Sequence, residues 1–121
     1  MPNFIKQSSP FIVSTTDGKL IEEHFGLASI RSGDYSIAHM IVPPGWLEPH
    51  QTPDFDEITM MVLGKKLIEV DGEEIILGEG ESLLVKKGAR VRYANPFDEP
   101  AEYWSLCMPA FTIERAGREE E

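Results

Sequence analysis

Turn residues interrupt this chain so often that no helix or strand within it can be long. The segments Asp17-Gly18, Ser32-Gly33-Asp34, Pro43-Pro44-Gly45 and Asp71-Gly72 separate runs rich in β-branched and aromatic residues. Asp-Gly pairs favour hairpin turns because glycine tolerates positive φ, and proline ends ladder pairing because it lacks a backbone donor. The runs recur about every 8 to 12 residues, a spacing typical of a β-sandwich or barrel. The pattern therefore predicts an all-β fold.

The expected strands lie between these turns. They are residues 11–16, 35–42, 55–63, 66–70, 73–77, 81–85, 90–94 and 101–108. Residues 20–25 fit an edge strand or one helical turn equally well. Because no repeat or linker divides the series, residues 1–121 are expected to form a single domain that ends in a polar, frayed tail at 114–121.

Composition narrows the classes of partner and compartment. The formal net charge of −10, with basic residues scattered, argues against nucleic acid as a partner. No segment approaches the roughly 20 apolar residues of a membrane helix, and the N-terminus does not resemble a signal peptide. The single cysteine, Cys107, fits a reducing compartment. We therefore expect a cytoplasmic protein that binds neither nucleic acid nor membrane.

Two glycine-bounded stretches in the middle of the chain hold the strongest functional signal. The first contains Gly45, His50, Thr52, Glu57 and Gly64, and the second contains Gly80, Lys86, Gly88, Val91 and Asn95. Together they resemble the paired signature of the cupin superfamily, Gly-x5-His-x-His-x3-4-Glu-x6-Gly followed by Gly-x5-Pro-x-Gly-x2-His-x3-Asn. The resemblance implies a double-stranded β-helix, the jelly-roll cupin barrel, with its core at about residues 34–110 and a ligand-sized cavity inside.

Four positions of the cupin signature carry metal ligands, and in this chain we assign them to His50, Thr52, Glu57 and Val91. Only His50 and Glu57 can then hold a metal, because threonine and valine do not replace imidazole nitrogens. Transition-metal sites normally need three or four protein ligands. We therefore expect no cofactor, with a divalent ion of Fe, Mn, Ni or Zn at low occupancy as the alternative.

The cupin resemblance also orients the strands, because side chains alternate between the two faces of a strand. With Glu57 inward as in the family, Phe55, Thr59, Met61 and Leu63 are expected to share its face. The strand before the first motif is expected to turn Ala38, Met40 and Val42 inward. With Val91 at the position of the family's last histidine, Tyr93 lies inward beside it. The final strand is expected to turn Trp104, Leu106 and Met108 inward and Tyr103, Ser105 and Cys107 outward. The expected pocket comprises Met40, Thr52, Phe55, Thr59, Met61, Val91, Trp104 and Leu106, with Trp46 as a lid or a packing plug.

Three functions follow from this pocket. The first is a small-molecule-binding cupin with an incomplete metal site and weak or no catalysis. The second is a metal-independent isomerase or epimerase, in which His50 held by Glu57 acts as base and Tyr93 supplies a proton, as in sugar epimerases of similar architecture. The third is a metal-dependent oxygenase or lyase with an unorthodox ligand set. In the first case His50 and Glu57 simply satisfy each other as a buried pair.

A more local likeness concerns phosphate chemistry and assembly. The run from Asp56 to Gly64, with Lys87-Gly88 and the Met-Pro-Ala at 108–110, is similar to the cupin domain of the ethanolamine-utilisation protein EutQ. That resemblance implies an acetate kinase activity, which is disfavoured because the chain has no Gly-rich phosphate loop of the Walker type. We also expect a homodimer, with the N-terminal strands at 11–31 near the partner, because exposed edge strands otherwise invite unwanted pairing.

Overall fold

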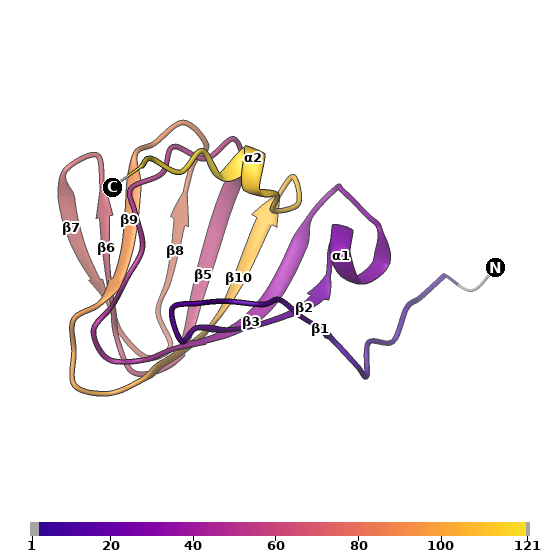
Figure 1. The fold of residues 1–121 in the computed structure, drawn as a ribbon, viewed down its shortest axis with the longest axis horizontal. Helices are drawn as coiled ribbons and strands as arrows, with labels where there is room; N and C mark the ends of the chain where they lie inside the picture. Colours follow the sequence, from indigo (N-terminus) through magenta and orange to yellow (C-terminus); the bar gives the residue numbers. More distant parts are fainter. Residues whose placement is uncertain (1–2, 121) are drawn as a thin grey trace.

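Two antiparallel β-sheets face each other in this computed structural model, which describes residues 3–120 (Figure 1). The six-stranded sheet has the order β1 (Phe11–Ile12), β2 (Leu20–Phe25), β3 (Ser36–Val42), β10 (Ala101–Met108), β5 (Asp56–Leu63) and β8 (Ser82–Val85). The four-stranded sheet has the order β4 (Trp46–Leu47), β9 (Val91–Asn95), β6 (Lys66–Val70) and β7 (Glu73–Leu77). This arrangement confirms the all-β, jelly-roll prediction.

The tightest turn of the chain joins β6 to β7. Val70 pairs with Glu73, so only Asp71 and Gly72 form the loop. Their φ angles are +49° and +86°, as a two-residue hairpin turn with positive φ at both positions requires. The hairpin predicted from the Asp-Gly pair is confirmed, and residues 20–25, which were ambiguous, form the strand β2.

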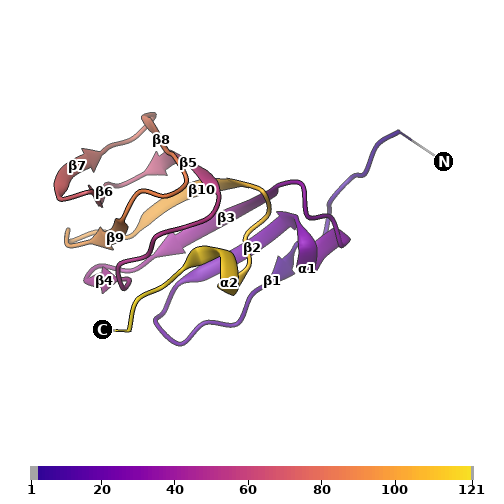
Figure 2. The same cartoon turned by 90° about the horizontal axis from the view of Figure 1, so that it is seen from above.

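Two short helices complete the fold, α1 (Leu27–Ile30) and α2 (Ile113–Ala116), and Figure 2 shows both from above. Thr112 caps α2 by accepting a hydrogen bond from the backbone N–H of Arg115 at 3.0 Å. After α2 the backbone bridges Arg118 to Gln51. The frayed tail predicted at 114–121 is therefore wrong for residues 114–119, because this cap and bridge hold them in place; Glu121 lies outside the described residues. Neither helix in the described part is long and apolar enough to cross a membrane.

The main hydrophobic core lies between the two sheets. Val42, Ile68 and Val91 are fully buried there, and Trp46 and Met61 pack against the same cluster. A second, smaller cluster brings Phe55 and Cys107 together with Ala116 of α2. Burial of this kind stabilises each large apolar side chain by about 1.5–3 kcal/mol. The cores therefore explain why the strand order is kept where turn chemistry alone would allow other pairings.

The predicted orientation is correct for most strands. On β3, Ala38 and Val42 are buried, and on β9 Val91 and Tyr93 are buried as predicted. On β5 the prediction is correct from Phe55 to Met61 but wrong for Leu63, which is 54% exposed. The register between β5 and β10 shifts at this end of the strand, and such a bulge changes which face a side chain takes.

The predicted orientation of β10 is wrong along its whole length. Residues directly opposite each other in a sheet share a face, and Tyr103 pairs with Met40 while Ser105 pairs with Ala38. Since β3 turns Met40 and Ala38 inward, Tyr103 and Ser105 must face inward too. Trp104 instead stacks on the outer face against His24 and His39, with ring centroids 5.0 and 5.1 Å away. On the same face, the two ring nitrogens of His39 contact carboxylates of β2 and β10, at 2.8 and 2.7 Å.

Gly64, the last residue of the first motif, has no room for a side chain. Its φ is +77°, and a Cβ built on it would lie 2.5 Å from the carbonyl oxygen of Pro100. We predict that Gly64→Ala lowers the free energy of unfolding by at least about 2 kcal/mol more than Gly72→Ala does, because only the first adds a clash to the cost of positive φ. Urea unfolding measures both.

Gly72 is the matched control because its φ is +86° and nothing lies within 4 Å of its added Cβ. Equal losses in the two variants would show that backbone conformation, and not contact with Pro100, decides the residue at position 64.

Candidate ligand-binding site

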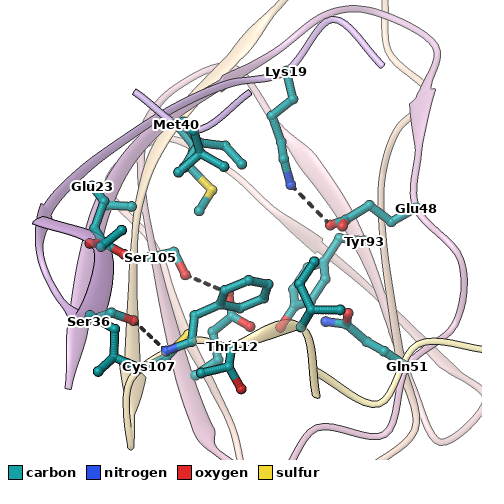
Figure 3. A pocket seen from close by; sticks show the side chains of 18 of the residues that line it. Lys19, Glu23, Ser36, Met40, Glu48, Gln51, Tyr93, Ser105, Cys107 and Thr112 are labelled. Atoms are coloured by element: carbon teal, nitrogen blue, oxygen red, sulfur yellow. Dashed lines mark hydrogen bonds and ion pairs between the residues drawn. The ribbon is translucent and has the colours of Figure 1, made fainter. Parts of the chain in front are cut away.

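A cavity of about 300 Å³ opens between the two sheets, and Figure 3 shows it from close by. Its wall has an apolar part and a polar part, and the strands β2 and β3 contribute side chains of both kinds. The apolar part includes Val13, Ile21, Ala38, Met40 and Phe111. The polar part includes Lys19, Glu48, Gln51, Glu57, Tyr93 and Ser105.

Glu57 brings a carboxyl group to the polar wall from β5. Ser105 on the neighbouring strand β10 donates a hydrogen bond from Oγ to Glu57 Oε2 at 2.5 Å. Burial raises the pKa of the Glu57 carboxyl above its ordinary value, although the Ser105 hydrogen bond and the charge of Lys66 partly oppose this. The carboxyl is thus kept in one orientation, and it holds its proton to a higher pH than an exposed glutamate does.

Tyr93 faces Glu57's part of the cavity from β9, on the opposite sheet. Its side chain is 3% exposed, and within residues 3–120 its hydroxyl oxygen has no hydrogen-bond partner. Burial raises the pKa of Tyr93 well above the ordinary value, and the nearby carboxyl of Glu57 adds to the effect. The phenol therefore remains protonated and keeps an unused O–H donor.

Lys66 carries an amine into the barrel interior behind these groups. Its Nζ lies 3.5 Å from the ring centroid of Tyr103 and 4.5 Å from that of Tyr93, and the residue is only 2% exposed. Burial lowers the pKa of Lys66 to about 7, while the charge of Glu57 opposes the shift. Aromatic faces stabilise a desolvated ammonium by about 2 kcal/mol or more. The sequence did not predict that Lys66 is buried, because it follows the Gly64 turn, where a lysine is normally exposed to solvent.

A second set of charges closes the polar wall around Glu48. Lys19 Nζ lies 3.5 Å from Glu48 Oε1, and Arg118 Nη2 donates to Glu48 Oε2 at 3.0 Å. Arg118 also reaches Gln51 Oε1 at 3.4 Å through Nε. The carboxylate of Glu48 is therefore neutralised by two cations, and this cluster joins the N-terminal segment to the chain after α2.

The predicted pair of His50 and Glu57 is wrong. His50 Nε2 lies 2.8 Å from Glu69 Oε2, and His50 is not among the residues that line the cavity. Its neighbour Gln51 faces inward instead, 4% exposed, because its backbone pairs with Val91 on β9. Alternation along the extended backbone then turns His50 and Thr52 away, and Thr52 is exposed.

The sequence did contain a signal for Gln51. In the cupin signature five residues separate the first glycine from the first histidine. After Gly45 these five are residues 46–50, so Gln51 occupies the first histidine position and Pro53 the second. Glu57 and Val91 keep the positions assigned to them. A shift of one residue thus separated the predicted ligand positions from those that the structure places inward.

The remaining pocket predictions divide into three groups. Met40, Glu57 and Tyr93 line the cavity as predicted. Phe55, Thr59, Met61, Val91 and Trp46 are buried but lie outside the cavity lining, and Trp46 donates from Nε1 to Asp17 Oδ2 at 2.8 Å as a packing residue. Trp104 and Leu106 lie on the outer face because β10 has the opposite orientation. The residues missed include Lys19, Glu23, Glu48, Gln51, Tyr103, Ser105, Cys107 and Arg118.

The donor set does not suit a tightly held metal. Residues 3–120 contain no group of three or more His, Cys, Asp and Glu side chains placed to hold an ion. Of the four ligand positions of the signature, glutamine, proline and valine occupy three, and only Glu57 retains a coordinating carboxylate. Cys107 does line the cavity, but burial raises the pKa of its thiol, which disfavours the thiolate that binds metals.

Comparison with known proteins gives a match to a protein family and a relative in sequence. The family described as "Cupin domain" (Cupin_2) matches residues 38–109. A Myxococcus xanthus (strain DK1622) protein named "Endoribonuclease YbeY" is 42% identical over 108 residues, which cover 89% of this chain. The match spans only 37% of that protein's length.

Solved structures of similar fold are all distant in sequence. An RmlC-like cupin from Shewanella frigidimarina NCIMB 400 superposes with a TM-score of 0.72 at 15% identity, covering 91% of this chain and 93% of that one. KdgF from Halomonas sp. gives 0.68 at 15% identity, with 82% and 87% covered. The EutQ protein of Clostridium difficile gives 0.58 at 20% identity, with 75% and 68% covered. These likenesses support the fold alone.

Replacing Lys66 by methionine is expected to remove a pH dependence of stability. Below pH about 7 the amine is charged in both states, whereas between about 7 and 10.5 the unfolded chain binds a proton that the folded chain releases. Wild-type stability should therefore rise with pH in this window, by up to about 1.4 kcal/mol per pH unit from this residue. Urea unfolding at about pH 7 and about pH 8.5 should show the rise in wild type and not in Lys66→Met.

Lys65→Met is the matched control, because it removes the same charge from an exposed neighbour. It should keep the wild-type slope. If Lys66→Met kept that slope as well, the amine of Lys66 would not be held in a desolvated site.

Proposed function

The chain belongs to the cupin domain family, and from this premise we propose that it binds a small, largely apolar molecule in the cavity between its two sheets. The observation that carries the proposal is the cavity itself, in which polar groups from both sheets interrupt a largely apolar wall. Ligand pockets typically measure about 300–1,000 Å³ and have this mixed character. The volume of about 300 Å³ suits a compact ligand.

We further propose that the site works without a resident metal and with weak or no turnover. A hydrated catalytic metal needs about three protein ligands, and the family's ligand positions offer one here. The interior already contains a positive group, Lys66, near the one retained carboxyl. A metal-dependent oxygenase or lyase is therefore the less favoured alternative.

The metal-independent isomerase remains a second candidate, in altered form. Its proposed base, His50, is engaged with Glu69 and does not line the cavity. Glu57 and Tyr93 both line it, however, and a carboxyl of raised pKa with an unused phenol is a combination that can move a proton. The acid–base pair of this candidate is thus Glu57 and Tyr93.

The name of the Myxococcus relative raises RNA cleavage as a further possibility. We leave it outside the proposal, because the match spans 37% of that protein and the present chain carries a formal charge of −10. Phosphate backbones repel such a surface unless basic residues cluster.

The homodimer expected from the sequence is kept as part of the proposal. The exposed apolar side chains Met60, Val62 and Leu84, on strands β5 and β8 of the six-stranded sheet, support it.

Ligand binding should be visible at Met40, the methionine that lines the cavity. With ¹³C-methyl methionine labelling, small apolar acids, ketones and phenols that raise Tm are expected to shift the Met40 methyl resonance. Met60 and Met108, each 39% exposed, should not move. Ala38→Leu fills the cavity from β3, so it should weaken binding at least about tenfold, or about 1.4 kcal/mol.

Ser82→Leu adds comparable bulk at an exposed position of β8 and should leave binding unchanged. Shifts at Met60 or Met108 with Met40 unmoved would place the ligand outside the cavity and contradict the proposal.

Elemental analysis tests the metal-free part of the proposal. Protein purified without chelators should contain well below one equivalent of Fe, Mn, Ni or Zn, because Glu57 lacks partner ligands of the usual kind. Near-stoichiometric metal that is lost in Glu57→Gln but kept in Glu69→Gln would favour the metal-dependent alternative.

A further inference from the structure

The buried hydroxyl of Tyr93 lacks a hydrogen-bond partner, although the rest of the interior is well satisfied. Within the described residues, the only other buried side-chain polar atom in this condition is the hydroxyl of Ser29. A buried, unsatisfied polar group costs about 1–3 kcal/mol, and native proteins seldom leave one without a reason. Because Tyr93 lines the cavity, the missing acceptor can come from a molecule bound there.

Glu57 supplies a second group at the same place. Its Oε2 accepts a hydrogen bond from Ser105, which orients the carboxyl (Figure 3). Its carboxyl lies close enough to the Tyr93 hydroxyl to raise the pKa of Tyr93, by its charge and by side-chain hydrogen bonding, although the hydroxyl meets no acceptor within the described residues at full hydrogen-bond geometry. In its protonated form, which burial favours, the carboxyl can donate from its other oxygen. Two O–H donors from opposite sheets then face the same part of the cavity.

The charges around these donors favour an oxygen that bears negative charge. Lys66 lies behind the Tyr93 ring, with Nζ 4.5 Å from its centroid. Two further carboxylates line the wall: Glu48 is neutralised by Lys19 and Arg118, and Glu23 accepts a hydrogen bond from the backbone N–H of Ser29. In a poorly hydrated interior such a positive charge interacts more strongly than it would in water.

We propose that Tyr93 and Glu57 form a two-donor cradle for a single ligand oxygen, and that the ligand is an apolar molecule carrying a phenolate or enolate oxygen. This inference rests on the proposed function, because it assigns the chemical class of the molecule bound in the cavity. The oxygen accepts from the phenol and from the carboxyl, with Lys66 behind them. The apolar body extends toward Met40 and Ile21 on the other wall.

Spectrophotometric titration with 4-nitrophenol tests the cradle, because its phenolate and neutral forms absorb at different wavelengths. The bound probe should show the phenolate band. 4-Nitrotoluene is similar in size but lacks the phenolic oxygen. Its binding is followed by methionine-methyl NMR, and it should bind at least about tenfold more weakly than 4-nitrophenol. Tyr93→Phe should remove the preference for 4-nitrophenol, lowering its affinity at least about tenfold while 4-nitrotoluene is unaffected.

Tyr35→Phe is the control, because it removes the same hydroxyl from a tyrosine that is 47% exposed and does not line the cavity. It should change 4-nitrophenol binding less than about threefold. Glu57→Gln keeps a donor, so it should weaken phenolate binding only modestly. Tighter phenolate binding in Glu57→Gln would show that the wild-type residue repels the anion, which overturns its donor role.

The outcomes separate this inference from the function on which it rests. Equal binding of both probes, with no difference between the two Tyr→Phe variants, would overturn the cradle and leave the cavity as a binding site. Binding of neither probe would count against both. Thermal unfolding of each variant confirms that the loss does not come from misfolding.

Discussion

The burial of the Lys66 ammonium constrains the rest of this structure. An isolated charge in a protein interior costs several kcal/mol, so the surrounding strands must supply compensating groups. Three rings do so, those of Tyr103 at 3.5 Å, Tyr93 at 4.5 Å and Trp46 at 5.8 Å from Nζ. These rings come from β4, β9 and β10, and therefore from both sheets. Relative sliding of the sheets would remove partners from the charge, so this contact helps to fix their register.

The same cluster determines what chemistry the interior supports. The cupin signature gathers imidazoles and a carboxylate round a divalent ion, whereas Gln51, Pro53 and Val91 occupy three of those positions here. A single ammonium behind a phenol and a carboxyl offers one positive charge and hydrogen-bond donors, with no open coordination site. Such an interior can orient and polarise a ligand oxygen. This physical limit is why binding, with slow proton transfer at most, follows from the structure more readily than metal-assisted chemistry.

Local chemistry made the strands predictable, and long-range pairing made the cavity unpredictable. The Asp71-Gly72 turn follows from neighbouring residues, and the inward face of β5 up to Met61 follows from strand alternation once the cupin resemblance places Glu57 inward. The inward side of β10 does not, because Ser105 and Cys107 are less apolar than Trp104 and only pairing with β3 decides between them. His50 was misplaced by one residue for a similar reason, since the bridge of Gln51 to Val91 sets which side chain enters.

The two parts of the cavity wall also differ in where they come from along the chain. Gln51, Glu57, Tyr93 and Ser105 lie within residues 38–109, the part that matches the cupin family. Much of the apolar wall instead comes from the flanking segments, with Val13 and Ile21 before it and Phe111 after it, and so does the cation Lys19. The fit of an apolar ligand would depend on those flanking segments, because apolar contacts have no preferred direction and select a ligand by its shape. Under the proposed function, the family core would hold a ligand's polar group, and the flanking segments would select the molecules that fit beside it.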